Sequence, residues 1–176
     1  MSGLLRELLA AHKLARTPDL AEALQACGLP SDGVPIWGVE FVELAGDYYQ
    51  PRSGGHPAII VPVFDAGTLV DLTATGLATR RTVTRMGAAS ILGQDAIDRA
   101  MEAGTHLHIF PDPIEWLRNR CNGAVVLDWR SAPFALSEVP AIACANELLT
   151  KKIDKALRQP LRVPPLYVRE ERRAAA

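Results

Sequence analysis

Apolar and polar positions change their spacing twice along the chain, and this pattern predicts helices at both ends with strands between them. Residues 4–15 place leucines at helical spacing with charged residues between them, as in an amphipathic helix. The pair Thr17-Pro18 is typical of a helix start and Gly28 of a helix end. We therefore predict an N-terminal helical hairpin over residues 1–28.

Strand patterns follow a break at residues 29–35, where turn-forming residues are concentrated. Residues 36–44 alternate and contain aromatic and β-branched side chains. The runs AIIVPVF and TLVDLTAT flank an Asp-Ala-Gly turn at residues 65–67, which is typical of a hairpin with a left-handed glycine. Residues 79–85, TRRTVTR, alternate again. These runs predict an antiparallel β-meander.

From residue 94 onward, helical and strand patterns alternate along the chain. A helix ending at Gly104 precedes the short strand LHIF, and Asp112 begins the next helix as its N-cap. The apolar strand AVVLDW and a long helix from Ser137 to Arg158 follow, with Lys152 among the lysines on the helix's outer side. Because a strand–helix–strand unit in one sheet crosses over right-handed, the two strands are expected to be parallel neighbours. The predicted fold class is α+β, with an α-β-α-β-α segment after the meander.

Length and composition favour one main folded unit. The chain has 176 residues, of which 48% are hydrophobic, enough for a core. We predict an α+β domain over residues 36–168, with a last strand at 161–168, and a disordered tail over 169–176. The three cysteines are far apart, so neither a disulfide framework nor a cysteine zinc site is expected. No apolar stretch approaches the ~20 residues of a membrane span and no signal peptide is evident, so we expect a soluble, cytoplasmic protein with no membrane partner.

Acidic residues follow both predicted strands of the C-terminal half. Asp112 comes after LHIF, and Asp128 closes VVLD. Open sheets bind ligands beyond the carboxyl ends of parallel strands, where two carboxylates can hold Mg²⁺ or divide acid and base roles. Asp112 and Asp128 are therefore candidate catalytic and metal-binding residues. The structural alternatives are a helix cap for Asp112 and a pairing of Asp128 with Arg130 or with solvent.

Two histidines on the predicted strand before Asp112 are further candidate metal ligands. His106 and His108 are two positions apart, so their rings lie on one face of a strand. His-x-His pairs occur in zinc and iron sites. No third ligand is evident nearby, and the polar face of an edge strand is the alternative explanation.

Three arginines form the densest basic cluster between the ends of the chain. On a strand, Arg81 and Arg85 lie on one face and Arg80 on the other, and all three are candidate contacts to the phosphates of DNA. The alternative is an exposed strand that its charges protect from aggregation. The net charge of −1 argues against a general coating of nucleic acid.

Residues 56–93, HPAIIVPVFDAGTLVDLTATGL…RMGAASILG, resemble the segment that precedes the Toprim domain in phage and plasmid primase-like proteins. The shared features are a His-Pro-Ala start, a β-hairpin and a closing Leu-Gly. Toprim catalysis requires a Glu after one strand and an Asp-x-Asp after a later one. This chain has Pro111-Asp112 and Asp128-Trp129-Arg130 there, so the resemblance implies a degenerate module of mobile-element origin.

Three functions of different class follow from the sequence. The favoured one, which is not an enzyme, is a non-catalytic or degenerate accessory module of DNA metabolism. It predicts salt-sensitive DNA binding that an Arg80/Arg81/Arg85→Ala variant loses. The second is a small metal-dependent enzyme, with Mg²⁺ as cofactor and a phosphate-containing substrate. The third is a protein-interaction domain that binds its partner through residues 1–28.

Overall fold

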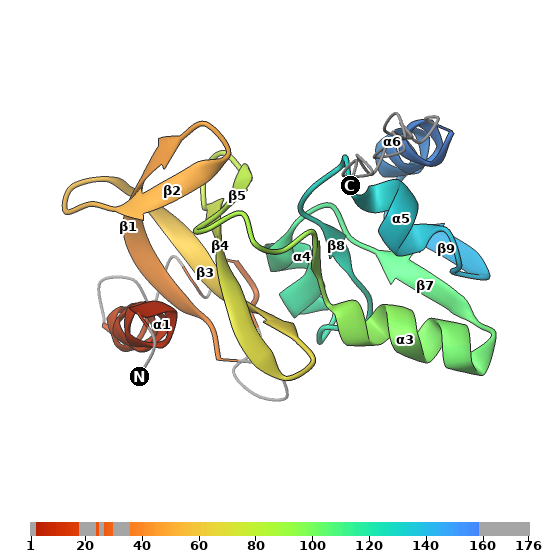
Figure 1. Ribbon diagram of the computed structural model, residues 1–176. Helices are drawn as coiled ribbons and strands as arrows, with labels where there is room; N and C mark the ends of the chain where they lie inside the picture. Colours follow the sequence, from red (N-terminus) through yellow and green to blue (C-terminus); the bar gives the residue numbers. More distant parts are fainter. Residues whose placement is uncertain (1–2, 18–23, 25–26, 30–35, 159–176) are drawn as a thin grey trace, which may run out of the picture.

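The computed structural model describes residues 3–17, 24, 27–29 and 36–158 (Figure 1). A β-barrel with one helix against it is followed by a smaller lobe of short strands and helices (Figure 1). This mixed architecture confirms the predicted α+β class. Most of the second helix of the predicted hairpin, the predicted strand at 161–168 and the predicted tail at 169–176 lie outside the described residues.

Five strands close into the barrel. They are β1 (Gly38–Ala45), β2 (Tyr48–Pro51), β3 (His56–Asp65), β4 (Thr68–Gly76) and β5 (Thr82–Thr84). Their order is β1-β2-β5-β4-β3, and neighbours are antiparallel except β2 and β5, which meet in parallel where Tyr48 pairs with Thr84. The predicted meander is therefore present, and closure removes the free edges that an open meander would expose.

The turn between β3 and β4 has the geometry of a tight hairpin. Asp65 pairs with Thr68, so only Ala66 and Gly67 lie in the turn. Both have positive φ angles, 44° for Ala66 and 77° for Gly67. Positive φ at both central residues is the type I′ arrangement, whose twist matches that of the flanking strands. The predicted left-handed glycine is confirmed, and an alanine shares its conformation.

Helix α1 (Gly3–Leu14) covers one side of the barrel, as the amphipathic pattern predicts. Leu8 and Ala11 are buried against the barrel core. The helix approaches so closely that a Cβ atom on Gly38 would lie 2.3 Å from the carbonyl carbon of Ala11. His12 adds a polar contact, 2.8 Å from its Nδ1 to the carbonyl oxygen of Trp37. A glycine at position 38 is therefore needed for this docking.

The second lobe alternates short strands and helices around its own core. Its elements are β6 (Ile91–Leu92), α3 (Gln94–Ala103), β7 (His106–Ile109), α4 (Pro113–Arg118), β8 (Val125–Val126), α5 (Ala132–Leu136), β9 (Ala141–Cys144) and α6 (Glu147–Leu157). Strands β6 and β8 are antiparallel, and β7 and β9 are parallel. Strand β7 meets the segment before β8 at one parallel bridge, between Ile109 and Ala124. The lobe thus contains a parallel pair, as predicted, but most of the pairing is with β9.

The predicted long helix from Ser137 to Arg158 is wrong in its first half, where the chain forms β9. Pro140 has no N–H for a helix and disfavours helical geometry in the residue before it. The helix begins later, because the side chain of Asn146 caps it by accepting a hydrogen bond of 2.9 Å from the Leu149 N–H. With this later start, Lys152 is the sixth residue of α6.

Candidate functional site

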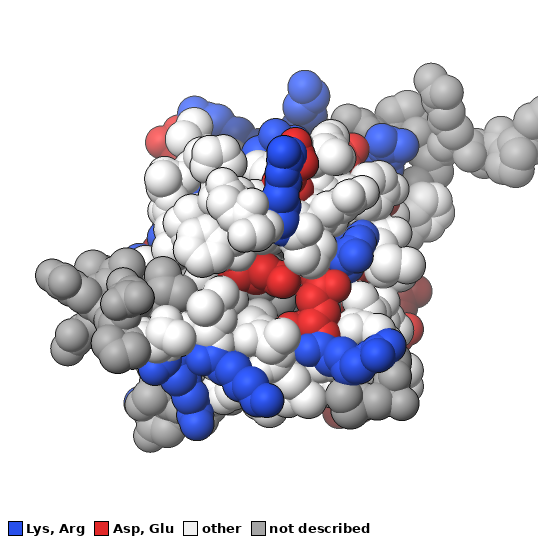
Figure 2. Space-filling view, turned by 90° about the vertical axis from the view of Figure 1, so that its left-hand side faces the viewer, with Lys and Arg blue, Asp and Glu red and all other residues white. Residues whose placement is uncertain are grey.

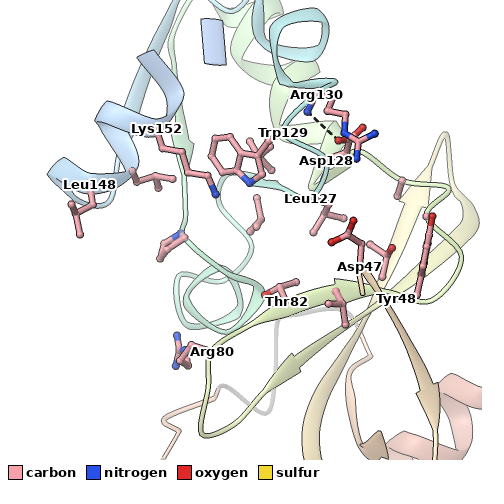
Figure 3. Close-up of a pocket in the computed structure, with 18 of the residues that line it drawn as sticks. Asp47, Tyr48, Arg80, Thr82, Leu127, Asp128, Trp129, Arg130, Leu148 and Lys152 are labelled. Atoms are coloured by element: carbon pink, nitrogen blue, oxygen red, sulfur yellow. Dashed lines mark hydrogen bonds between the residues drawn. The ribbon is translucent and has the colours of Figure 1, made fainter. Parts of the chain in front are cut away.

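A cavity of about 680 Å³ lies between the barrel and the second lobe (Figure 3). Its size is within the range of small-molecule sites. The barrel contributes the β1–β2 turn and β5, and the second lobe contributes the segment around β8 and the first turns of α6. We call this cavity the interlobe pocket, and its lining residues with polar or aromatic side chains are Asp47, Tyr48, Arg80, Thr82, Thr84, Asp128, Trp129, Arg130, Asn146 and Lys152.

Lys152 is the cation that defines one side of the interlobe pocket. Its Nζ atom lies 3.7 Å from the centre of the Trp129 ring, a close cation–π contact. Burial of the ammonium against the ring lowers the pKa of Lys152. Within the described part of the chain no carboxylate lies at ion-pair distance from it, and Glu147 of the same helix pairs with Lys151. The described lining therefore contains an ammonium that is available to an anionic group of a ligand.

Asp128 lies on another side of the interlobe pocket, as a firmly held carboxylate (Figure 3). The Ser131 hydroxyl donates to its Oδ2 at 2.6 Å and the Arg130 backbone N–H to its Oδ1 at 3.0 Å. The hydrogen bond from Ser131, followed by the contributions of Arg130, lowers the pKa of Asp128. This candidate residue therefore lines a cavity, and its carboxylate favours the ionised state.

Asp112 has a structural role instead. It caps α4 by accepting hydrogen bonds from the N–H groups of Ile114 and Glu115, at 2.9 and 3.0 Å. Its two oxygens also bind the Arg80 guanidinium at 2.9–3.1 Å, and its exposure is only 6%. Asp112 is not among the residues that line the interlobe pocket, although Arg80 is. The structure therefore does not bring the two predicted carboxylates into one cavity.

Asp112→Ala is expected to lower the free energy of unfolding by about 2–4 kcal/mol, since it removes a helix cap and leaves the half-buried Arg80 without its main partner. Asp128→Ala, at a more exposed carboxylate, is expected to cost less than about 1 kcal/mol. Urea unfolding of both variants measures the difference. Equal stabilities of the two variants would contradict the structural role of Asp112.

The three candidate DNA-binding arginines point to three different elements. Arg80 binds Asp112 and Glu115 of the α4 region. Arg81 donates to the Gly46 carbonyl in the β1–β2 turn. Arg85 places its Nε 3.1 Å from Glu7 Oε2 on α1. The arginines therefore have intramolecular partners and form no common surface, so a DNA contact through them stays a prediction.

The candidate metal ligands do not form one group, because the histidine pair and the two aspartates belong to different clusters. His106 and His108 lie exposed on one face of β7 with their Nε2 atoms 3.0 Å apart, which confirms that the two rings share a face. The Arg80 guanidinium occupies both oxygens of Asp112. Over the residues that the structure describes, no group of three or more His, Cys, Asp and Glu side chains is arranged to hold a metal ion. The candidates His106, His108, Asp112 and Asp128 thus form no such group in the described structure, and metal binding by them stays a prediction.

A buried polar cluster on the barrel was not predicted from the sequence. The Tyr49 hydroxyl donates to Glu7 Oε1 at 2.8 Å, and the buried Oε2 atom of Glu40 has no hydrogen-bond partner among the residues that the structure describes. Burial, and then the charge of Glu7, raise the pKa of Glu40 to about 7, against an opposing effect of Arg85. The face at this end of the barrel shows acidic side chains in a hollow with basic ones above and below (Figure 2). The available signal was that Glu40 occupies the same strand face as buried Val42.

Comparisons with protein-family models, curated proteins and solved structures find no match for this chain. The resemblance of residues 56–93 to the segment before a Toprim domain therefore stays a prediction. None of the helices in the described ranges has the length and hydropathy of a membrane span. The functional argument depends on the geometry of the interlobe pocket.

Proposed function

We propose that the chain is a non-catalytic accessory module that binds a nucleotide, or a similar organic phosphate, in the interlobe pocket. The observation that carries this proposal is the ammonium of Lys152, which lies over Trp129 without a carboxylate partner in the described structure. An accessory role in DNA metabolism, proposed from the sequence, is compatible with such a ligand.

The Lys152 side of the pocket suits a phosphate. Lys152 follows Leu148 by four residues, so both project from one face of α6 into the cavity. The N-terminal turn of this 11-residue helix also lines the cavity, through Asn146 and Leu149. Backbone N–H groups at a helix N-terminus attract anions, and a nearby ammonium adds a charge-assisted hydrogen bond.

The rest of the pocket suits the remainder of a nucleotide. Trp129 and Leu127 provide apolar surface in the middle of the cavity (Figure 3). Asp47 and Asp128 lie away from Lys152 in this view and offer carboxylate oxygens (Figure 3). Such oxygens accept hydrogen bonds from the amino group of a base or from a ribose hydroxyl. A ligand with an anion at one end and donors at the other therefore matches the lining.

The residue types in the lining bear on whether the pocket binds a ligand or transforms it. The described residues around the cavity include no His, Cys or Ser side chain, and these are the commonest general bases and nucleophiles. The pKa of Asp128 is lowered, whereas a carboxylic general acid needs a raised pKa. That the module is not an enzyme stays a proposal, because Asp47, Tyr48 and Lys152 of the same lining are residue types that can also transfer protons.

Lys152→Gln is expected to weaken the binding of AMP at least tenfold, about 1.4 kcal/mol, because the charged partner of the phosphate is lost. Quenching of tryptophan fluorescence measures binding, and Trp129→Phe identifies the ring that responds. Lys155→Gln is the matched control, since Lys155 is exposed on the same helix and does not line the cavity. Adenosine without phosphate is expected to bind much more weakly than AMP.

Three results would contradict the proposal. One is an absence of binding by AMP at millimolar concentration. Another is equal affinity for AMP and adenosine, because the phosphate would then contribute nothing. The third is equal AMP affinity in Lys152→Gln and Lys155→Gln, because Lys152 would then not be the anion-binding group.

A further inference from the structure

The histidine pair on β7 lies outside the interlobe pocket and has a geometry of its own. His106 and His108 alternate with Leu107 and Ile109, which are buried at 2% and 0% exposure. The core therefore fixes the strand, and the alternation directs both imidazoles outward on one face. Both rings are exposed and accessible to an ion from solvent.

The two rings are held in defined positions. Their planes make an angle of 78° with centroids 4.7 Å apart, and the His108 ring also stacks on Phe110 at 6.4 Å. Across the parallel ladder, His106 pairs with Ala141 and His108 with Ala143, whose small side chains leave the space beside the imidazoles open. The two rings therefore already contact each other on the open face of β7.

The separation of the two nitrogens corresponds to chelation. The Nε2 atoms lie 3.0 Å apart and share a hydrogen bond, in which one ring donates its N–H to the other, so a metal ion that binds both nitrogens would displace this proton. If a metal ion lay about 2.0–2.1 Å from each nitrogen, the separation of 3.0 Å would give an N–metal–N angle of about 95°. That angle is close to the 90° between neighbouring ligands of a tetragonal ion and narrower than the angle of a tetrahedral zinc site.

We propose that His106 and His108 form a two-imidazole surface site for a tetragonal divalent transition metal, with Cu²⁺ preferred over Ni²⁺ and Zn²⁺. Imidazole is a ligand for all three ions, and Cu²⁺ is the strongest binder in the series of divalent ions. The described residues offer no third His, Cys, Asp or Glu in the same group, so water or an external donor fills the remaining positions. Neither Asp112 nor Asp128 is part of this site, and it is independent of the proposed phosphate ligand.

Titration of the full chain with CuCl₂ at pH 7.5, followed by calorimetry and electron paramagnetic resonance, tests the site. We expect one Cu²⁺ per chain, a spectrum with nitrogen ligands, and a weaker response to NiCl₂ and ZnCl₂. His106→Ala and His108→Ala are each expected to reduce Cu²⁺ affinity at least tenfold, because each removes half of the chelate. His56→Ala is the matched control, since it removes an exposed histidine at the start of β3.

Circular dichroism shows whether the variants remain folded, which the exposure of both rings leads us to expect, and His106→Gln repeats the test with a polar side chain of similar length. Retention of the Cu²⁺ affinity in either alanine variant would overturn the site. Tighter binding of Zn²⁺ than of Cu²⁺ would overturn the tetragonal geometry. A loss of affinity in His56→Ala equal to that in His108→Ala would show that the pair on β7 is not the chelate.

Discussion

Asp71→Asn is expected to lower the free energy of unfolding by about 3–5 kcal/mol. Asp71 is fully buried on β4, and its carboxylate accepts four backbone hydrogen bonds. The donors are the N–H groups of Leu72, Arg85, Met86 and Ala88, at 2.8, 3.1, 2.9 and 2.8 Å. An asparagine keeps the shape but replaces one acceptor oxygen with an NH₂ group, which faces these donors without being able to accept from them.

The effect of this substitution is expected to reach the interlobe pocket. Three of the four donors belong to the segment that leads from β5 to β6, and Gly87 and Ala89 of that segment line the cavity. Urea unfolding measures the loss of stability, and AMP titration measures the loss of binding. Asp65→Asn is the control, because Asp65 is an exposed aspartate at the end of the same hairpin. A loss for Asp71→Asn no larger than that for Asp65→Asn would contradict this role of the carboxylate.

The second large effect is a loss of stability as the pH rises through about 7. The pKa of Glu40 is raised to about 7 in the folded protein, from the ordinary glutamate value of 4.5. Because the folded state binds the proton of Glu40 more tightly than the unfolded state, this group contributes to the free energy of unfolding. The contribution is fully present below the unfolded pKa and is lost as the pH rises through the folded pKa. Because Glu40 is only half-buried, solvent screening reduces the expected loss between pH 5 and pH 8.5 to about 1–2 kcal/mol.

Glu40→Gln is expected to remove most of this pH dependence, since the amide stays neutral at both pH values. Urea unfolding at pH 5 and pH 8.5 compares the two proteins. Glu43→Gln is the control, because Glu43 is exposed on the opposite face of β1 and pairs with Arg52. If the wild type and Glu40→Gln lost equal stability between the two pH values, ionisation of Glu40 next to Glu7 would not be the cause.

Local patterns in the sequence were sufficient for much of the fold. The helical spacing of the N-terminal leucines predicted α1, and the Asp-Pro pair at residues 112–113 predicted the start of α4. The predicted long helix from Ser137 is wrong because helical spacing alone does not form a helix across Pro140, and the Asn146 cap begins the helix at Glu147. Barrel closure could not be predicted, because it depends on a pairing between Tyr48 and Thr84 that no local pattern encodes.

The candidate site was predicted only in part, for a physical reason. Asp128 and Asp112 follow their strands in similar ways, yet only Asp128 lines the pocket, because Asp112 also meets Arg80 from a distant loop. The sequence predicts Lys152 on the outer side of a helix that begins at Ser137. The observed helix begins ten residues later, at Glu147. Asp71 is not singled out by the sequence pattern and lies fully buried inside the fold. Contacts between remote segments determine all three outcomes.

The seam of the barrel is also a wall of the interlobe pocket. Strands β2 and β5 meet at Tyr48 and Thr84, the Thr84 N–H donates to the Asp47 carbonyl at 3.2 Å, and all three residues line the cavity. A ligand in the cavity therefore contacts the residues at which β2 and β5 close the barrel, a pairing of one residue on each strand. Ligand binding in the interlobe pocket and pairing of β2 with β5 are then thermodynamically linked, so a ligand that binds the closed barrel more tightly also stabilises the closed barrel. Slower amide hydrogen exchange at Thr84 would report that the ligand is bound.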